Sequence, residues 1–200
     1  MATNPTLVGE IAEFVREEHA TVLLPLLMKM DRIADRLEEG DAVPVDEVRV
    51  GLGLWSRYLS QVRVPRIRDL FGAFPIAEEI PACASRIREL REQQILENTR
   101  VPSLERMLGY YSTGQFGGRP MLTGMLRGAS ASDRAWAAYE EEYVVHCLVR
   151  SIAPASQARA EETLRRAREV LRGLAAEVDT YVGAAATTVA APPSPTTAPA

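Results

Sequence analysis

The chain has 200 residues, of which 46% are hydrophobic and 25% are charged, a balance typical of a globular protein with a packed core. Its 23 basic and 27 acidic residues give a net charge of −4, which argues against general nucleic-acid binding, because that binding needs a cationic surface. The sequence shows no signal-peptide pattern and no apolar stretch near the ~20 residues of a membrane span, so we expect a cytoplasmic protein. Arginine greatly outnumbers the single lysine, a bias typical of a GC-rich bacterial genome.

The first two helices are predicted from apolar residues that recur every three or four positions, and a proline interrupts each helix. The first should run from about residue 5 or 7 to residue 39, with Pro25 bending or restarting it, because proline removes one backbone hydrogen bond. The second should span residues 46–71, with Asp46 as its cap and Pro65 as its interruption.

A third helix is predicted from about residue 77 or 81 to residue 110, kinked or split at Pro102. Residues 112–130 contain five glycines and are expected to form a long loop. The favoured role of this loop is a crossover between distant helix ends. A mobile functional loop is the alternative, and the segment has no phosphate-binding motif.

The fourth helix should begin at Ser132 or Asp133 and end near Ile152, before the Ala-Pro pair at residues 153–154. A fifth, amphipathic helix should span about residues 156–181. Its charged face is interpreted as a solvated outer surface.

The predicted fold is all-α, because no stretch alternates apolar and polar residues as a strand would. We expect residues 1–182 to form an antiparallel four-helix bundle with an additional C-terminal helix. Residues 183–200 are rich in Ala, Pro and Thr and carry no charge, so we expect a disordered tail.

The two histidines, His19 and His146, both fall within predicted helices. His19 continues an apolar stripe and should point inward, with Glu18 beside it, whereas His146 follows Glu142 by one helical turn. Because imidazole and carboxylate together suit iron, manganese or zinc, these four residues are the candidate metal ligands. The alternative is that the histidines are ordinary core or boundary residues.

Three short motifs occur along the chain in the same order as in a known family of helical bundles. Glu18-His19 lies ahead of a Leu-Glu-Glu-Gly turn, the second helix ends in a Leu-Phe pair, and His146 precedes a proline turn. The segments concerned are Glu18-His19, Leu37–Gly40, Leu70–Ala73, and His146 with Pro154. Over about residues 7–74, and more faintly over 80–156, the chain resembles the hemerythrin-like (HHE) family of four-helix bundles. That resemblance implies non-haem iron and the handling or sensing of oxygen, nitric oxide or peroxide.

The chain departs from this family where further ligands should stand. Arg63 and Arg66 take the places of a histidine and an acidic ligand in the second helix, Asn98 is nearest to a third-helix ligand, and Arg150 follows His146. A guanidinium stays protonated and has no lone pair for a metal. We therefore expect a reduced or vestigial metal site, in which Arg63 or Arg66 pairs with Glu18 or Glu142.

Two functions remain open from the sequence. The first is a divergent hemerythrin-like protein with a reduced iron site. The alternative is a metal-free helical module that binds a protein partner, or a second copy, through the fifth helix or the tail. An enzyme with a pocket at the glycine-rich segment has the least support, so the chain is expected not to be an enzyme.

Overall fold

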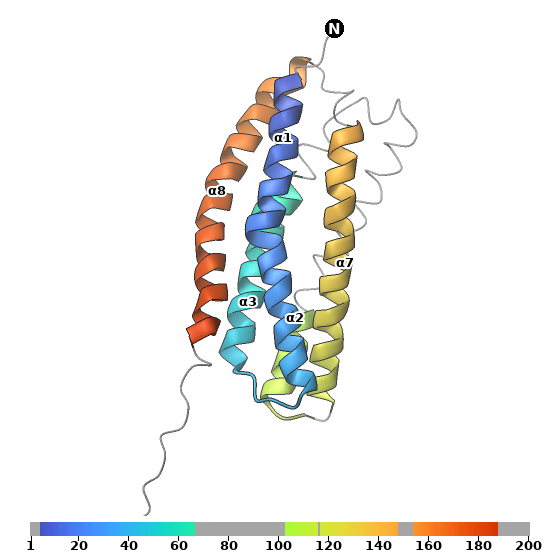
Figure 1. Cartoon of the computed structure of the whole chain (residues 1–200), viewed down its shortest axis with the longest axis vertical. Helices are drawn as coiled ribbons and strands as arrows, with labels where there is room; N and C mark the ends of the chain where they lie inside the picture. Colours follow the sequence, from blue (N-terminus) through green and yellow to red (C-terminus); the bar gives the residue numbers. More distant parts are fainter. Residues whose placement is uncertain (1–4, 67–102, 116, 148–153, 188–200) are drawn as a thin grey trace, which may run out of the picture.

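The computed structural model describes residues 5–66, 103–115, 117–147 and 154–187. Within these ranges the chain is helical apart from short turns and contains no strand, which confirms the predicted all-α class for the described part. The long helices lie side by side along the longest axis of the molecule (Figure 1). None of the described helices combines the length and the apolar character that crossing a membrane requires.

The first helical segment is interrupted by a wider turn at the position of its proline. Helix α1 (Pro5–Glu18) passes into η1, a π-helical turn (His19–Leu23), and then into α2 (Leu24–Glu38). In the π-helical turn a backbone N–H donates to the carbonyl five residues earlier instead of four. Pro25 is the second residue after this turn, so the predicted interruption takes the form of a π turn next to a residue that has no N–H to donate.

The second helical segment repeats this construction. Helix α3 (Val45–Tyr58) passes into the π turn η2 (Leu59–Arg63) and then into the short α4 (Val64–Arg66), which contains Pro65. The interruption predicted at Pro65 is therefore confirmed, again as a π turn that ends just before the proline. The predicted continuation to residue 71 lies outside the described residues.

The start of α3 differs from the prediction. Asp46 does not cap the helix: Pro44 occupies the N-cap position with an extended backbone, and no side chain caps the first turn. Asp46 instead lies within the first turn, where it forms an exposed ion pair with Arg49. A proline is tolerated at the start of a helix because the first N–H groups have no partner within the helix.

Helix α7 (Gly118–Cys147) is longer than predicted, and the expectation of a loop over residues 112–130 is wrong from residue 118 onward. Leu122 and Leu126 are buried one turn apart, whereas Gly124 between them is exposed. A glycine inside a helix costs about 1 kcal/mol, but burial of one leucine side chain contributes about 1.5–3 kcal/mol. Tertiary burial therefore outweighs the low helix propensity of this segment.

Helix α8 (Pro154–Thr187) begins at the proline where a break was predicted and ends later than expected. Residues 183–187, which were expected to begin the tail, belong to this helix, and residues 188–200 lie outside the described part. Helix α8 packs against α1, α2 and α3 (Figure 1). Of the predicted third helix, residues 103–112 are helical, and the part before residue 103 is not described.

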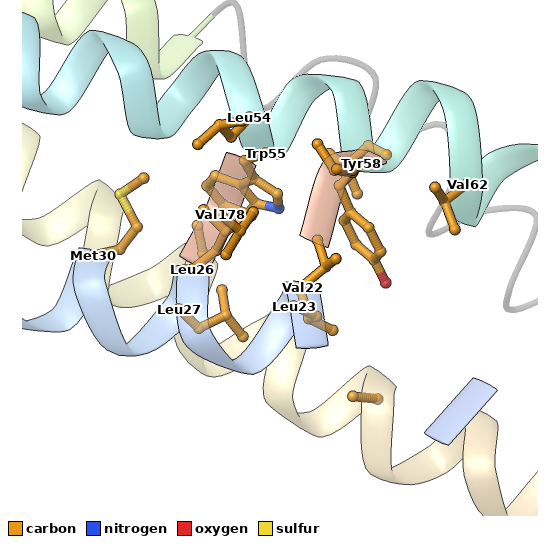
Figure 2. Packing of buried hydrophobic residues seen from close by; sticks show 14 of the residues in the cluster. Val22, Leu23, Leu26, Leu27, Met30, Leu54, Trp55, Tyr58, Val62 and Val178 are labelled. Carbon is orange, nitrogen blue, oxygen red and sulfur yellow. The ribbon is translucent and has the colours of Figure 1, made fainter. Parts of the chain in front are cut away.

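The core lies between these helices and changes from apolar to polar along its length. Figure 2 shows apolar side chains of η1 and α2 facing those of α3, with Val178 of α8 beside them. Trp55 and Tyr58 are the largest aromatic residues in this packing, and both are almost fully buried. The hydroxyl end of Tyr58 points away from its own helix, towards the polar site described next.

Candidate functional site

Seven polar side chains from α1, η1, α3, η2, α4 and α7 are buried together, and each is at most 1% exposed. We call them the buried charge cluster. Its members are Glu18, His19, Tyr58, Arg63, Arg66, Asp133 and Glu140. Removing charged groups from water is costly unless they are paired and hydrogen-bonded, so their pairing decides what this site can do.

Arg66 lies at the centre of the buried charge cluster. Its Nε donates to Oε2 of Glu18 at 2.8 Å, and its Nη2 donates to Oε1 of Glu18 at 2.8 Å. The same Nη2 also donates to Oε2 of Glu140 at 2.6 Å. A planar guanidinium matches a carboxylate in this two-bond geometry, which makes such contacts strong and directional. Arg66 therefore connects α4 to both α1 and α7.

Arg63 makes a second set of contacts on α7. Its Nε donates to Oε1 of Glu140 at 3.1 Å, and its Nη1 donates to Oδ1 of Asp133 at 3.4 Å. Asp133 and Glu140 are two helical turns apart and so lie on one face of α7. Asp133 is thus not the start of a helix, as the sequence had suggested for Ser132 or Asp133, but an internal acid.

His19 and Tyr58 complete the contacts to the two glutamates. The hydroxyl of Tyr58 donates to Oε1 of Glu18 at 2.7 Å. Nε2 of His19 lies 3.3 Å from Oε2 of Glu140, the oxygen that also accepts from Arg66. The imidazole nitrogen and the end of the guanidinium therefore meet at one carboxylate oxygen.

Electrostatics keep the central groups of the cluster in defined protonation states. Burial alone would raise the pKa of Glu140, but the charges of Arg63 and Arg66 outweigh it and hold that pKa well below its ordinary value. Burial would likewise lower the pKa of Arg66, yet Glu140 and Glu18 raise it further above its ordinary value. Burial and the charge of Glu18 raise the pKa of Tyr58, which keeps its hydroxyl a donor.

The π turns explain how the helices present these residues. Buried side chains recur every four positions along the first segment, at Ile11, Val15, His19, Leu23 and Leu27. In a regular α-helix, four-residue steps drift by about 40° each, so this series would leave the buried face. The wider turn of η1 offsets the drift at the position of His19. Such turns occur frequently at functional sites.

Part of the buried charge cluster has the composition of a metal site. Glu18, His19 and Glu140 each offer one ligand atom, and these atoms lie within 4.8 Å of one another. Two carboxylates and one imidazole are suitable ligands for a transition metal, so this buried group could hold an ion. The remaining question is whether the ligand atoms are available.

The ligand atoms of this Glu-His-Glu group already take part in hydrogen bonds within the protein. The oxygens of Glu18 accept three hydrogen bonds, one from Tyr58 and two from Arg66. A carboxylate has about four acceptor positions, so little of Glu18 is left for an ion. A divalent cation would also lie beside the positive charge of Arg66. In this arrangement the group fits a guanidinium and does not fit an additional metal ion.

Two structural predictions at this site are confirmed, one on the orientation of a side chain and one on an ion pair. His19 points inward, since it is 1% exposed, and Glu18 lies beside it in the core. The expected ion pair between Arg66 and Glu18 is present. His19 was identifiable from the apolar helical stripe that it continues. The pairing of Arg66 with Glu18 was expected because the resemblance puts Arg66 at a ligand position, where a buried arginine needs an acidic partner.

The side chains of two other predicted site residues are not described. Glu142 and His146 belong to α7, but their side chains are not described, so the convergence of His146 with His19 stays a prediction. The acid that contacts both arginines is Glu140, which was not among the predicted site residues. Glu140 was detectable because it continues the buried stripe of Leu126 and Asp133 in steps of seven residues.

Comparisons with protein-family models, with curated proteins and with solved structures found no match. The hemerythrin-like resemblance therefore depends on the motifs of this chain alone.

Proposed function

We propose that this protein is a divergent hemerythrin-like four-helix bundle with an added C-terminal helix, and that it works without a bound metal. One observation supports this most directly: Arg66 donates to both oxygens of Glu18 and to one oxygen of Glu140. A guanidinium cannot ligate a metal, but it supplies a positive charge among carboxylates. In this proposal the guanidinium of Arg66 takes the place of the metal cation that the resemblance to the hemerythrin-like family implies.

The proposed role is that of a helical interaction module and not of an iron protein that handles oxygen, nitric oxide or peroxide. A cluster in which both buried arginines are paired with acids favours one arrangement of the helices, because an alternative packing would leave a buried charge without its partner. Leaving one partner unpaired costs about 3–5 kcal/mol. The bundle would then act through its outer surface, on a protein partner or on a second copy of the chain.

The metal content of the purified protein tests the first half of this proposal. We expect far less than one iron, manganese or zinc ion per chain after growth in medium that contains all three metals. We also expect the same melting temperature with added Fe²⁺, with added Zn²⁺ and with a chelator. One tightly held ion per chain that is lost in a His19→Ala variant would refute the metal-free proposal.

A pull-down from cells followed by mass spectrometry tests the proposed role as an interaction module. Sedimentation of the full chain over a wide concentration range would show whether it associates with itself. Cross-linking in cells would identify a protein partner. A chain that stays monomeric and is recovered without any stoichiometric partner would contradict the interaction role.

A metal-dependent function is the second candidate, and the spacing of Glu18, His19 and Glu140 favours it. In that case an ion would have to displace Arg66 from its hydrogen bonds with both glutamates. The wild-type protein would then gain thermal stability with rising metal concentration, because a ligand that binds only the folded state stabilises it.

A further inference from the structure

The ligand atoms of the Glu-His-Glu group converge on the end of the Arg66 side chain. Oε2 of Glu140 accepts from Arg66 at 2.6 Å and lies 3.3 Å from Nε2 of His19. Glu18 faces the same guanidinium with both of its oxygens. We infer that Glu18, His19 and Glu140 form a preassembled cation site, which Arg66 occupies and closes to divalent metal ions. This inference rests on the proposed metal-free function.

The site is assembled by the fold and not by Arg66 alone. Glu18 and His19 come from the junction of α1 and η1, and Glu140 comes from α7. These helices pack directly against each other, so the three ligand atoms stay near one another without a bridging arginine. A second donor, Tyr58, holds Glu18 from the side of α3 at 2.7 Å.

Arg66, and not Arg63, is the residue that closes the site. Arg63 binds Glu140 through the other oxygen, Oε1, and extends towards Asp133. Removal of Arg66 would free three acceptor positions on the two glutamates, including the one next to His19. Removal of Arg63 would leave the contacts of Arg66 with Glu18 in place.

Truncation of Arg66 would also leave a cavity in the buried charge cluster, with more negative than positive charge around it. Its side chain is fully buried, so shortening it leaves a cavity with polar walls. Among the described residues, the cluster would then hold Arg63 against the carboxyl groups of Glu18, Asp133 and Glu140. Such a buried anionic cavity favours a cation, and its one imidazole and two carboxylates select a divalent transition metal. Three protein ligands leave a coordination position for water.

The test compares Arg66→Ala with the wild type, using Co²⁺ and Zn²⁺ as probes. We expect Arg66→Ala to bind one ion per chain in equilibrium dialysis, to show cobalt absorption bands, and to melt at a higher temperature as Zn²⁺ is added. The wild type should show none of these effects. Adding His19→Ala to Arg66→Ala should abolish the binding.

Two variants serve as matched controls. Arg63→Ala removes an equally buried arginine but keeps Arg66, so it should not gain a metal. Arg66→Met removes the same charge but fills the space, so it should bind far less metal than Arg66→Ala. Metal uptake by Arg63→Ala equal to that of Arg66→Ala would overturn the assignment to Arg66.

The outcomes separate this inference from the proposed function. One ion per wild-type chain would contradict the proposed function, whereas a folded Arg66→Ala that binds no ion would overturn only the inference. If Arg66→Ala does not fold alone, the same Zn²⁺ titration is followed by circular dichroism, together with Arg66→His. Metal that restores the helical signal supports the inference, because binding and folding are then coupled. Failure of both variants to respond overturns it.

Discussion

The guanidinium of Arg66 and the carboxylate of Glu18 face each other across the core, joined by two hydrogen bonds of 2.8 Å. Both residues are fully buried, and they are 48 positions apart in the sequence. Such a pair does not by itself show high stability, because the desolvation of both charges opposes their attraction. It does mean that removal of either partner should lower the free energy of unfolding, and this loss can be measured.

Arg66→Met and Glu18→Gln should each lower the free energy of unfolding by about 3–5 kcal/mol, because each leaves a buried partner without its main contact. The double variant should lose much less than the sum of the two single losses. The measurement is urea unfolding, since guanidinium chloride would add a competing cation. As a control, Arg57→Met breaks an exposed pair with Glu177 and should cost less than about 1 kcal/mol. Additive losses in the double variant would contradict the pairing.

The acid stability of the fold should depend on Glu140. The charges of Arg63 and Arg66, against the opposing effect of burial, hold its pKa in the folded state below the unfolded value of about 4.3. Its contribution to stability is therefore complete above that unfolded value and is lost as the pH falls towards the folded pKa.

Glu140→Gln should accordingly be less stable at neutral pH and should lose less further stability on acidification than the wild type. The measurement is the urea midpoint at a series of pH values from neutral to about pH 3. Glu177→Gln is the control, because that carboxylate is about half exposed and its ion pair is screened by solvent. Parallel pH profiles for wild type and Glu140→Gln would show that Glu140 does not carry this dependence.

Helical periodicity predicted much of the fold, but it missed the π turns. Along the second segment, Trp55, Leu59 and Arg63 are buried at strict four-residue intervals, and so are Tyr58, Val62 and Arg66. A regular helix shifts such a series by about 40° at every step, so a sustained interval of four beside a proline is the sequence signal of a π turn. The proline alone indicates an interruption, and the four-residue interval identifies it as a π turn.

The start of α7 was missed for a different reason. The glycines and Pro120 in residues 112–130 lower local helix propensity, and a single sequence does not show that Leu122 and Leu126 are covered by other helices. Continuing that apolar stripe in steps of three and four would have reached Asp133 and Glu140. The candidate site was therefore within reach of the periodicity, once the helix was allowed to begin before residue 132.

Lys29, the only lysine of the chain, should resist amine acylation while the protein is folded. Its side chain is 5% exposed, its Nζ lies 2.5 Å from Oε1 of Glu47 and 5.4 Å from the centre of the Tyr181 ring. The hydroxyl of Tyr181 donates to the backbone oxygen of Glu47 at 2.8 Å, which fixes α8 over this pair.

Peptide mass spectrometry after brief treatment with an acetylating reagent measures this protection. We expect little acetylation of Lys29 in buffer, nearly complete acetylation in urea, and an intermediate rate in Tyr181→Ala, where the cover is reduced. Free lysine in the same tubes checks the reagent. Equal labelling of the wild type with and without urea would contradict the burial of this amine.

Two glycines of α7 should respond in opposite directions to the same substitution. A Cβ at Gly118 would lie 2.7 Å from the carbonyl carbon of Tyr110 and 2.8 Å from the backbone nitrogen of Tyr111, closer than packed atoms allow. The backbone there cannot easily withdraw, because the Tyr111 hydroxyl accepts from the N–H of Val43 at 3.1 Å and donates to its carbonyl at 3.0 Å.

Gly118→Ala should therefore lower the free energy of unfolding by about 1–3 kcal/mol, the usual cost of overpacking. Gly124 is exposed within the same helix, and among the described residues no atom beyond its own helix backbone and chain neighbours lies within 4 Å of the place a Cβ would take. Gly124→Ala should therefore raise stability by about 0.5–1 kcal/mol through helix propensity alone. The measurement is the urea midpoint of each variant. The two variants can be compared directly, because both make the same glycine-to-alanine change within one helix. A stabilising Gly118→Ala would mean that residues 103–112 do not press against the start of α7.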